Sequence, residues 1–161
     1  VIAGNIKDVK ALDPTPDSWA ANPANAVAVY TVKMDANAVW TLPKSNKDAH
    51  RTIFFYKGES VEIEGKSVKV NHLVEALAGE DISIQNGDQE SYFLILEGKP
   101  IGEPVVQHGP FVMNTADEIR ETMREYGRTQ FGGWPWKETE VAHPREKGRF
   151  ALHSDGREEI K

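Results

Sequence analysis

The feature that most constrains the fold of this chain is a succession of short β-type segments between residues 26 and 96. The segments at 26–32, 51–56 and 92–96 are compact and rich in valine, isoleucine, phenylalanine and tyrosine. Turn-forming glycine, asparagine and aspartate separate such segments at intervals of about ten residues, which is typical of antiparallel sandwiches and barrels. There is no glycine-rich phosphate loop and no alternation of strands with helices, which disfavours a nucleotide-binding α/β fold. We therefore expect an all-β, antiparallel fold.

Two pairs of segments are predicted to form hairpins. Gly58 lies between 51–56 and 60–64, where a tight turn needs a positive φ. The second arm alternates apolar residues with Glu62 and Glu64, the period of a strand with one solvated face, and we favour this interpretation over metal binding by the two glutamates. Asn86, Gly87 and Asp88 are expected to join a second pair. That pair consists of 81–85 and 92–96, and two further short strands are expected at 38–42 and 67–70.

One helix is predicted over residues 115–127. Thr115 and Glu118 fit a capping box, in which each side chain accepts from the other residue's backbone N–H. Ile119, Met123 and Tyr126 form one apolar stripe at helical spacing. Gly127 is expected to end the helix.

The remaining segments divide the chain into four parts. Residues 1–25 contain three prolines among small and polar residues, so they are expected to be an irregular leader or interdomain segment. Residues 26–114 would form the β-domain, 115–127 the helix, and 128–161 an extended, aromatic-rich arm and tail.

Composition excludes several kinds of site and partner. The chain has no cysteine, which rules out disulfides, thiolate nucleophiles and cysteine-based zinc sites and is compatible with a cytoplasmic location. Its formal charge is −6, with no cluster of lysine and arginine, so direct nucleic-acid binding is not expected. No apolar run approaches the roughly 18 to 20 residues of a membrane helix, so we expect no membrane contact.

Three segments resemble pirin-like proteins. Residues 102–115 read GEPVVQHGPFVMNT, which is similar to a signature of that family. Residues 128–136, RTQFGGWPW, resemble its bacterial branch, and residues 1–4, VIAG, resemble the entry to its second half. The resemblance implies two tandem cupin domains packed face to face, each a jelly-roll-like antiparallel β-barrel. This chain resembles the C-terminal one, with its helix and extended arm.

The resemblance also implies where metal would bind. In such proteins the N-terminal cupin holds iron or another divalent metal through three histidines and one glutamate, and this chain is expected to lack those positions. The general cupin pattern places Arg51 at the glutamate position and Ile82 at a second ligand position, with the paired histidines near Lys44 and Asn46. A guanidinium and a hydrocarbon cannot bind a divalent cation, and His50 alone is a single possible ligand. We therefore expect no metal or cofactor in this chain.

No catalytic residue is predicted, since the five histidines are scattered without ligand spacing and there is no G-x-S-x-G elbow. Gln107 and His108 are candidates for a contact near a ligand pocket or the interdomain seam. The alternative for His108 is a structural role, in which its imidazole bonds backbone in a glycine–proline bend. Trp134 and Trp136 are candidates for interface anchors, and an aromatic ligand site is their alternative.

These observations predict a structural role, in which the chain covers, orients or completes a metal-bearing N-terminal cupin domain of the same protein. The intact protein is expected to be either a metal-dependent quercetin 2,3-dioxygenase-like enzyme or a regulatory protein that binds a transcription factor or metabolic enzyme. A third possibility is that the cavity of this domain binds a small apolar ligand. By itself the chain is expected to self-associate through its helix stripe and its C-terminal tryptophans.

Overall fold

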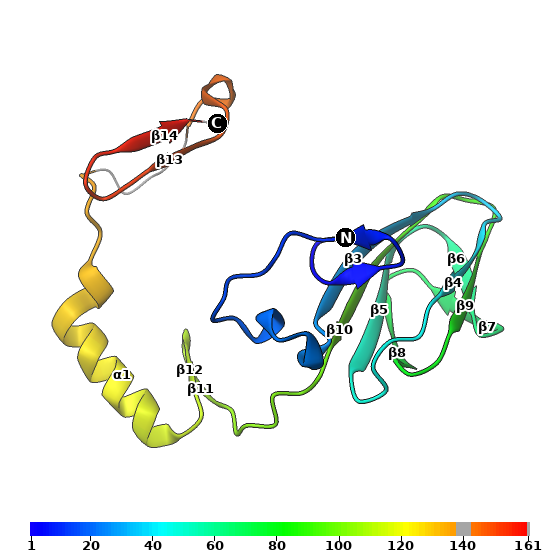
Figure 1. Cartoon of the computed structure of the whole chain (residues 1–161), viewed down its shortest axis with the longest axis horizontal. Helices are drawn as coiled ribbons and strands as arrows, with labels where there is room; N and C mark the ends of the chain where they lie inside the picture. Colours follow the sequence, from blue (N-terminus) through cyan, green and yellow to red (C-terminus); the bar gives the residue numbers. More distant parts are fainter. Residues whose placement is uncertain (138–142, 161) are drawn as a thin grey trace. The chain divides into compact units, whose positions relative to one another are not determined.

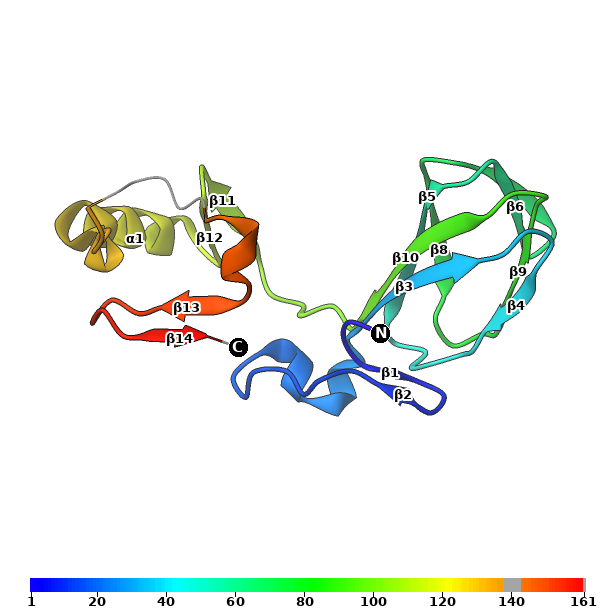
Figure 2. The same ribbon diagram turned by 90° about the horizontal axis from the view of Figure 1, so that it is seen from above.

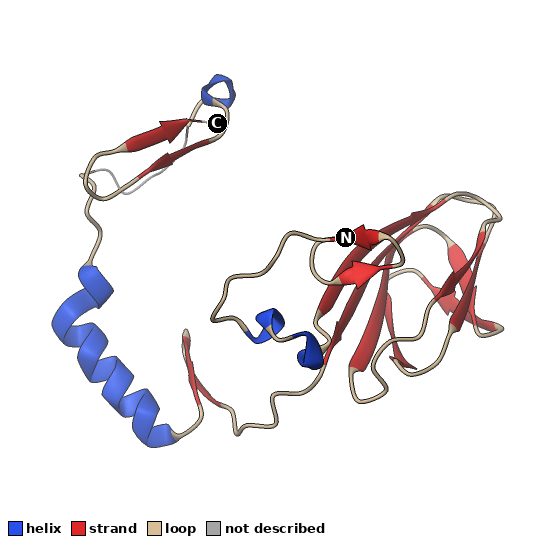
Figure 3. Cartoon of the chain, viewed as in Figure 1, coloured by secondary structure: helices blue, strands red, loops and turns tan. Residues whose placement is uncertain are grey.

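The computed structural model describes residues 1–137 and 143–160 and divides the chain into two compact units, Val1–Ile101 and Gly102–Lys161. Strands dominate the first unit, and the long helix belongs to the second (Figures 1 and 3). The unit boundary therefore precedes the predicted junction at residues 114 and 115. None of the helices in the described part of the chain is long and apolar enough to cross a membrane.

The first unit contains two four-stranded antiparallel sheets, which confirms the predicted all-β class. The first sheet has the order β3 (Ala28–Met34), β10 (Ser91–Gly98), β5 (His50–Lys57), β8 (His72–Leu77). The second has the order β4 (Val39–Leu42), β9 (Ile82–Asn86), β6 (Ser60–Ile63), β7 (Lys66–Lys69). The strand pairings of the described residues give two separate sheets and not a closed barrel.

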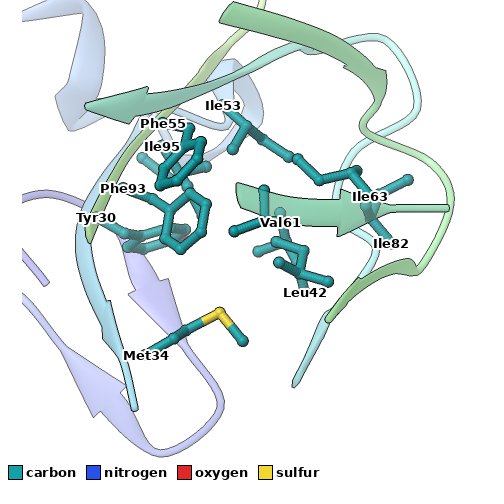
Figure 4. Close-up of a cluster of buried hydrophobic side chains, with 12 residues drawn as sticks. Tyr30, Met34, Leu42, Ile53, Phe55, Val61, Ile63, Ile82, Phe93 and Ile95 are labelled. Carbon is teal, nitrogen blue, oxygen red and sulfur yellow. The ribbon is translucent and has the colours of Figure 1, made fainter. Parts of the chain in front are cut away.

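The core of this unit lies between the two sheets, where side chains from both point toward one another (Figure 4). Alternate residues of β5 and β10 face inward, and the rings of Phe55 and Phe93 stack with centroids 5.2 Å apart. The opposing sheet contributes Leu42, Val61 and Ile84, each at most 2% exposed. The period-2 pattern of the sequence therefore places one face of every central strand in the core.

Both predicted hairpins are wrong. β5 pairs with β10 and β8, whereas β6 pairs with β7 and β9, so Gly58 connects the two sheets. Likewise β9 and β10 belong to different sheets. An alternating pattern shows which face of a strand is buried but does not identify the strand beside it. Here the chain passes from one sheet to the other between β5 and β6 and again between β9 and β10.

Residues 1–25, expected to be an irregular leader or interdomain segment, lie within the first unit. They form β1 (Asn5–Ile6), β2 (Val9–Lys10) and two 3₁₀ turns, η1 (Trp19–Ala21) and η2 (Pro23–Asn25). Ala3 forms a bridge to Val29 on β3, and Ile6 packs against the core. Figure 2 shows the β1–β2 hairpin beside one end of the sandwich.

The second unit begins with the hairpin β11 (Val106–His108) and β12 (Phe111–Met113), followed by the helix α1 (Ala116–Thr129). The capping box of Thr115 and Glu118 is present as predicted. The helix does not end at Gly127, because it continues to Thr129 and Gln130 then takes the left-handed conformation with φ of 52°. A glycine costs a helix interior only about 1 kcal/mol, so it need not end one.

The predicted helix stripe is only partly buried. Ile119 is 5% exposed, whereas Met123 and Tyr126 are 43% and 41% exposed. The ring of Tyr126 contacts those of Phe111 and Phe131 at centroid distances of 5.8 and 5.2 Å.

The predicted C-terminal arm contains short regular elements. It holds the turns η3 (Gln130–Gly132) and η4 (Arg145–Lys147) and a hairpin of β13 (Phe150–Leu152) and β14 (Glu158–Ile160). Residues 138–142 and 161 of that arm lie outside the described residues.

Candidate functional site

A buried ion pair occupies the position where the cupin pattern would place a metal-binding glutamate. Arg51 on β5 and Glu97 on β10 are directly opposite in register, and their side chains are 0% and 3% exposed. Arg51 Nε donates to Glu97 Oε1 at 2.7 Å. The rest of the guanidinium donates to two backbone carbonyls, that of Glu80 at 3.0 Å and that of Pro43 at 2.7 Å.

The carboxylate of Glu97 has a second partner, the hydroxyl of Ser45, which donates to Oε2 at 2.5 Å. The network therefore gives a partner to each nitrogen of the guanidinium and to each oxygen of the carboxylate. Paired and hydrogen-bonded charges are the form in which a protein interior tolerates ions, because an isolated buried charge is strongly destabilising.

The residues at this position do not fit a divalent cation. A guanidinium stands in place of the carboxylate ligand, and it already neutralises the nearby Glu97. Ile82, at the second ligand position, is 6% exposed and belongs to the hydrocarbon core. His50 is exposed on β5 and Lys44 is exposed after β4. Within residues 1–137 and 143–160, no group of three or more histidine, cysteine, aspartate or glutamate side chains could hold a metal ion.

Sequence reasoning identified Arg51 but missed Glu97. The signal that could have found Glu97 is its opposite charge at a cross-strand position, since opposite charges facing each other stabilise a pair of strands. That signal becomes readable only once β5 is known to pair with β10.

A cavity of about 630 Å³ adjoins this ion pair within the first unit. Its walls come from residues 2–14, the turns η1 and η2, the start of β3 and the segment after β4, and they include Tyr30, Ser45 and Glu97. The Tyr30 hydroxyl donates to the Asn5 carbonyl at 2.7 Å. Burial, reinforced by the charge of Glu97, raises the pKa of Tyr30 above its ordinary value.

The four candidate contact residues lie in the second unit, and none of them lines this cavity. Gln107 and His108 are exposed at the end of β11, where Gln107 Nε2 donates to the Gly109 carbonyl at 3.4 Å. The rings of Trp134 and Trp136 lie 4.7 Å apart at 60°, and these residues are 52% and 36% exposed. Their proposed roles as pocket or interdomain contacts stay predictions.

The fold defines the class of protein. A sandwich of two four-stranded antiparallel sheets with this strand order is similar to a solved structure of quercetin 2,3-dioxygenase from Acinetobacter baumannii, with a TM-score of 0.68 and 24% identity. The match covers 82% of this chain and 43% of that one, and it shows that the chain has a cupin fold.

The family model of the pirin C-terminal cupin domain matches residues 29–132. The chain therefore belongs to that family, as the sequence resemblance predicted. Two provisionally named relatives are a pirin-like protein of Arabidopsis thaliana and a quercetin 2,3-dioxygenase of Vibrio cholerae. The first is 34% identical over 116 residues, which cover 71% of this chain and 36% of that protein. The second is 39% identical over 79 residues, which cover 49% of this chain and 27% of that protein. The matched segment thus spans about a third of these relatives' length or less.

Proposed function

We propose that this chain is the metal-free, structural cupin of a two-cupin protein and acts by covering and orienting a metal-binding N-terminal cupin. The observation that carries the proposal is the Arg51–Glu97 ion pair, which occupies a metal-ligand position of the cupin pattern with a satisfied internal network. Such a domain contributes shape and contact surface, while iron or another divalent metal is held by the other cupin.

The outer face of the first sheet supports an interdomain role. In the cross-strand row of Leu94, Phe54 and Leu73, the side chains point away from the core, because their neighbours Phe93 and Phe55 point into it. Leu73 is 50% exposed, and Tyr56 and Tyr92 extend the same face. An antiparallel sheet with one face in water normally alternates apolar and polar side chains, so two apolar faces favour a covering partner.

The second candidate function concerns the whole protein. Relatives named quercetin 2,3-dioxygenase favour an iron-dependent dioxygenase-like enzyme of which this chain is one half. Relatives named pirin leave open the regulatory alternative, a protein that binds a transcription factor or metabolic enzyme. In either case this chain's contribution is positional, and the absence of cysteine supports a cytoplasmic location.

The test is the metal content of this chain and of a longer protein that includes the preceding cupin, both loaded with Fe²⁺ and measured by elemental mass spectrometry. We expect near-stoichiometric iron in the longer protein and none above background in the chain. Near-stoichiometric iron in the chain alone would overturn the structural proposal. Oxygen consumption with quercetin, measured on the longer protein, then separates the enzyme from the regulatory protein.

A further inference from the structure

The cavity beside the ion pair has the dimensions of a small-molecule site. Its volume of about 630 Å³ falls within the range of roughly 300 to 1,000 Å³ that is typical of ligand pockets. All the residues that line it belong to the first unit. The proposed structural role assigns it no function.

The walls of the cavity are small and mostly apolar. Six of the lining residues are alanines, and because an alanine side chain ends at Cβ, the space beside them stays open. The alanines are Ala3, Ala11, Ala20, Ala21, Ala26 and Ala28. Pro14, Pro23 and Val27 add further hydrocarbon surface. Such a lining favours a compact ligand with little polar surface.

Three polar side chains that line the cavity, those of Tyr30, Ser45 and Glu97, can accept a hydrogen bond from a ligand. The hydroxyls of Tyr30 and Ser45 each give their proton to a protein acceptor, the Asn5 carbonyl and Glu97, and retain a free lone pair. Glu97 accepts hydrogen bonds from Ser45 and Arg51, and an ionised carboxylate has room for about four. These three side chains therefore offer lone pairs to a ligand that brings its own proton.

The charges around the cavity are already paired. Glu97 is neutralised by Arg51 inside, and Lys10 pairs with Asp13 at the rim with Nζ and Oδ1 2.7 Å apart. A charged ligand would lose its hydration on entering the cavity, and these paired charges would not compensate for that loss, which is unfavourable. Charge complementarity therefore favours a neutral ligand.

We propose that this cavity binds a neutral, mostly apolar alcohol or phenol, with its hydroxyl group donating to the acceptor cluster of Glu97, Ser45 and Tyr30. The hydrocarbon part then lies against the alanine walls. This assigns the chain a ligand site of its own, separate from any metal.

The experiment titrates 4-ethylphenol into the isotope-labelled chain and follows backbone amide shifts of residues that line the cavity. Two matched probes are ethylbenzene, which lacks the hydroxyl, and 4-ethylbenzoate, which is an anion. We expect saturable shifts with 4-ethylphenol. The affinity for each of the other two probes should be at least about fivefold weaker, which is the difference that roughly one net hydrogen bond makes.

Two variants locate the binding. Ala21→Leu fills the cavity from η1 and should abolish the saturable shifts, whereas Ala24→Leu, on the neighbouring turn η2 and outside the lining, should leave them unchanged. Equal affinity for ethylbenzene, retained binding in Ala21→Leu, or no saturable shift at residues of the cavity would each overturn the proposal. Iron content of the same samples reports separately on the structural proposal, so the two can fail independently.

Discussion

Among single residues, the Arg51–Glu97 pair explains how a cupin interior is completed without a metal. Charge, hydrogen bonds and register converge there, since the two residues are cross-strand neighbours and the two terminal nitrogens of the guanidinium each donate to a backbone carbonyl. Removing one member of a buried ion pair leaves the other charge uncompensated, which strongly lowers the stability of the fold. Replacing both members with hydrocarbon side chains changes the stability much less.

We expect Arg51→Met to lower the free energy of unfolding by about 3 to 5 kcal/mol, because it leaves the Glu97 carboxylate buried and unpaired. Urea unfolding monitored by circular dichroism measures this change. The control is the double variant Arg51→Met with Glu97→Leu, which removes both charges and should recover most of the loss. A single variant within about 1 kcal/mol of the parent would contradict this account of the pair.

Tyr30 predicts a pH dependence in the alkaline range. Its folded-state pKa is raised by burial and by Glu97, so the folded chain keeps a proton that the unfolded chain loses at about pH 10. This stabilisation is complete below pH 10 and is lost as pH rises through the folded-state pKa, at up to about 1.4 kcal/mol per pH unit. The free energy of unfolding in urea should be measured between pH 8 and 11 for the parent and for Tyr30→Phe. Above pH 10 it should fall more steeply with pH in the parent, and parallel pH dependences would refute the prediction.

Position 58 requires glycine both because of its backbone conformation and because there is no room for a side chain. Its φ is 134°, and a Cβ there would collide with Ser91 Oγ and lie 2.8 Å from the Phe55 ring. Gly65 is the matched control, because its φ is 69° and a Cβ there would meet nothing within 4 Å. We expect Gly58→Ala to cost about 2 kcal/mol more than Gly65→Ala in thermal or urea unfolding. Equal costs would show that the close packing at Gly58 relaxes easily.

Individual residues were predictable from the sequence to an uneven degree. The turn chemistry of Gly58 and the unsuitability of Arg51 and Ile82 as ligands follow from local pattern and side-chain chemistry. Glu97 and the cavity do not, because they depend on segments distant in sequence. Tyr30 and Glu97 come together through the pairing of β3 with β10, and the cavity also needs walls from residues 1–25, which gave no regular pattern.

At the scale of single elements, the sequence predicted structure best where side chains bond the backbone of the same element. The predicted capping box is formed in α1, where Glu118 N donates to Thr115 Oγ1 at 3.2 Å and Thr115 N donates to Glu118 Oε2 at 2.8 Å. The strand β8 was missed because His72–Leu77 has no strict alternation and contains residues that strands disfavour. The predicted partners of β5 and β9 were wrong because the strand that follows each of them in sequence belongs to the opposite sheet.

We expect Thr115→Ala to destabilise α1 by about 1 kcal/mol, because it removes the acceptor for the Glu118 amide. Thr115→Ser keeps the hydroxyl and is the control, with little change expected. Amide hydrogen exchange within α1 is the appropriate measurement, since it reports local opening even when global unfolding is unchanged. Identical exchange in the two variants would argue that the cap contributes nothing.

For the whole molecule, the apolar outer face of the first sheet predicts how the isolated chain behaves. Phe54 and Leu94 are half-buried side by side on that face, and Leu73 continues it. We expect the chain to self-associate and the double variant Phe54→Thr with Leu94→Thr to reduce association, as measured by light scattering at several concentrations. Trp134→Ser with Trp136→Ser is the matched comparison, because it tests the second unit instead. A strictly monomeric parent chain would contradict the prediction.

The order of strands in the two sheets also has a consequence for how the chain acquires its structure. β3 pairs with β10 and β4 pairs with β9, so neither sheet can be completed until the last strands of the first unit have been synthesised. Until then β3 and β4 have no strand to pair with, although β5 can pair with β8 and β6 with β7. Because pairing between distant segments pays the entropy of closing long loops first, we expect refolding on the slow scale of milliseconds to seconds that is typical of all-β sandwiches. The topology that encloses this core therefore also makes the nascent chain a natural client for chaperones.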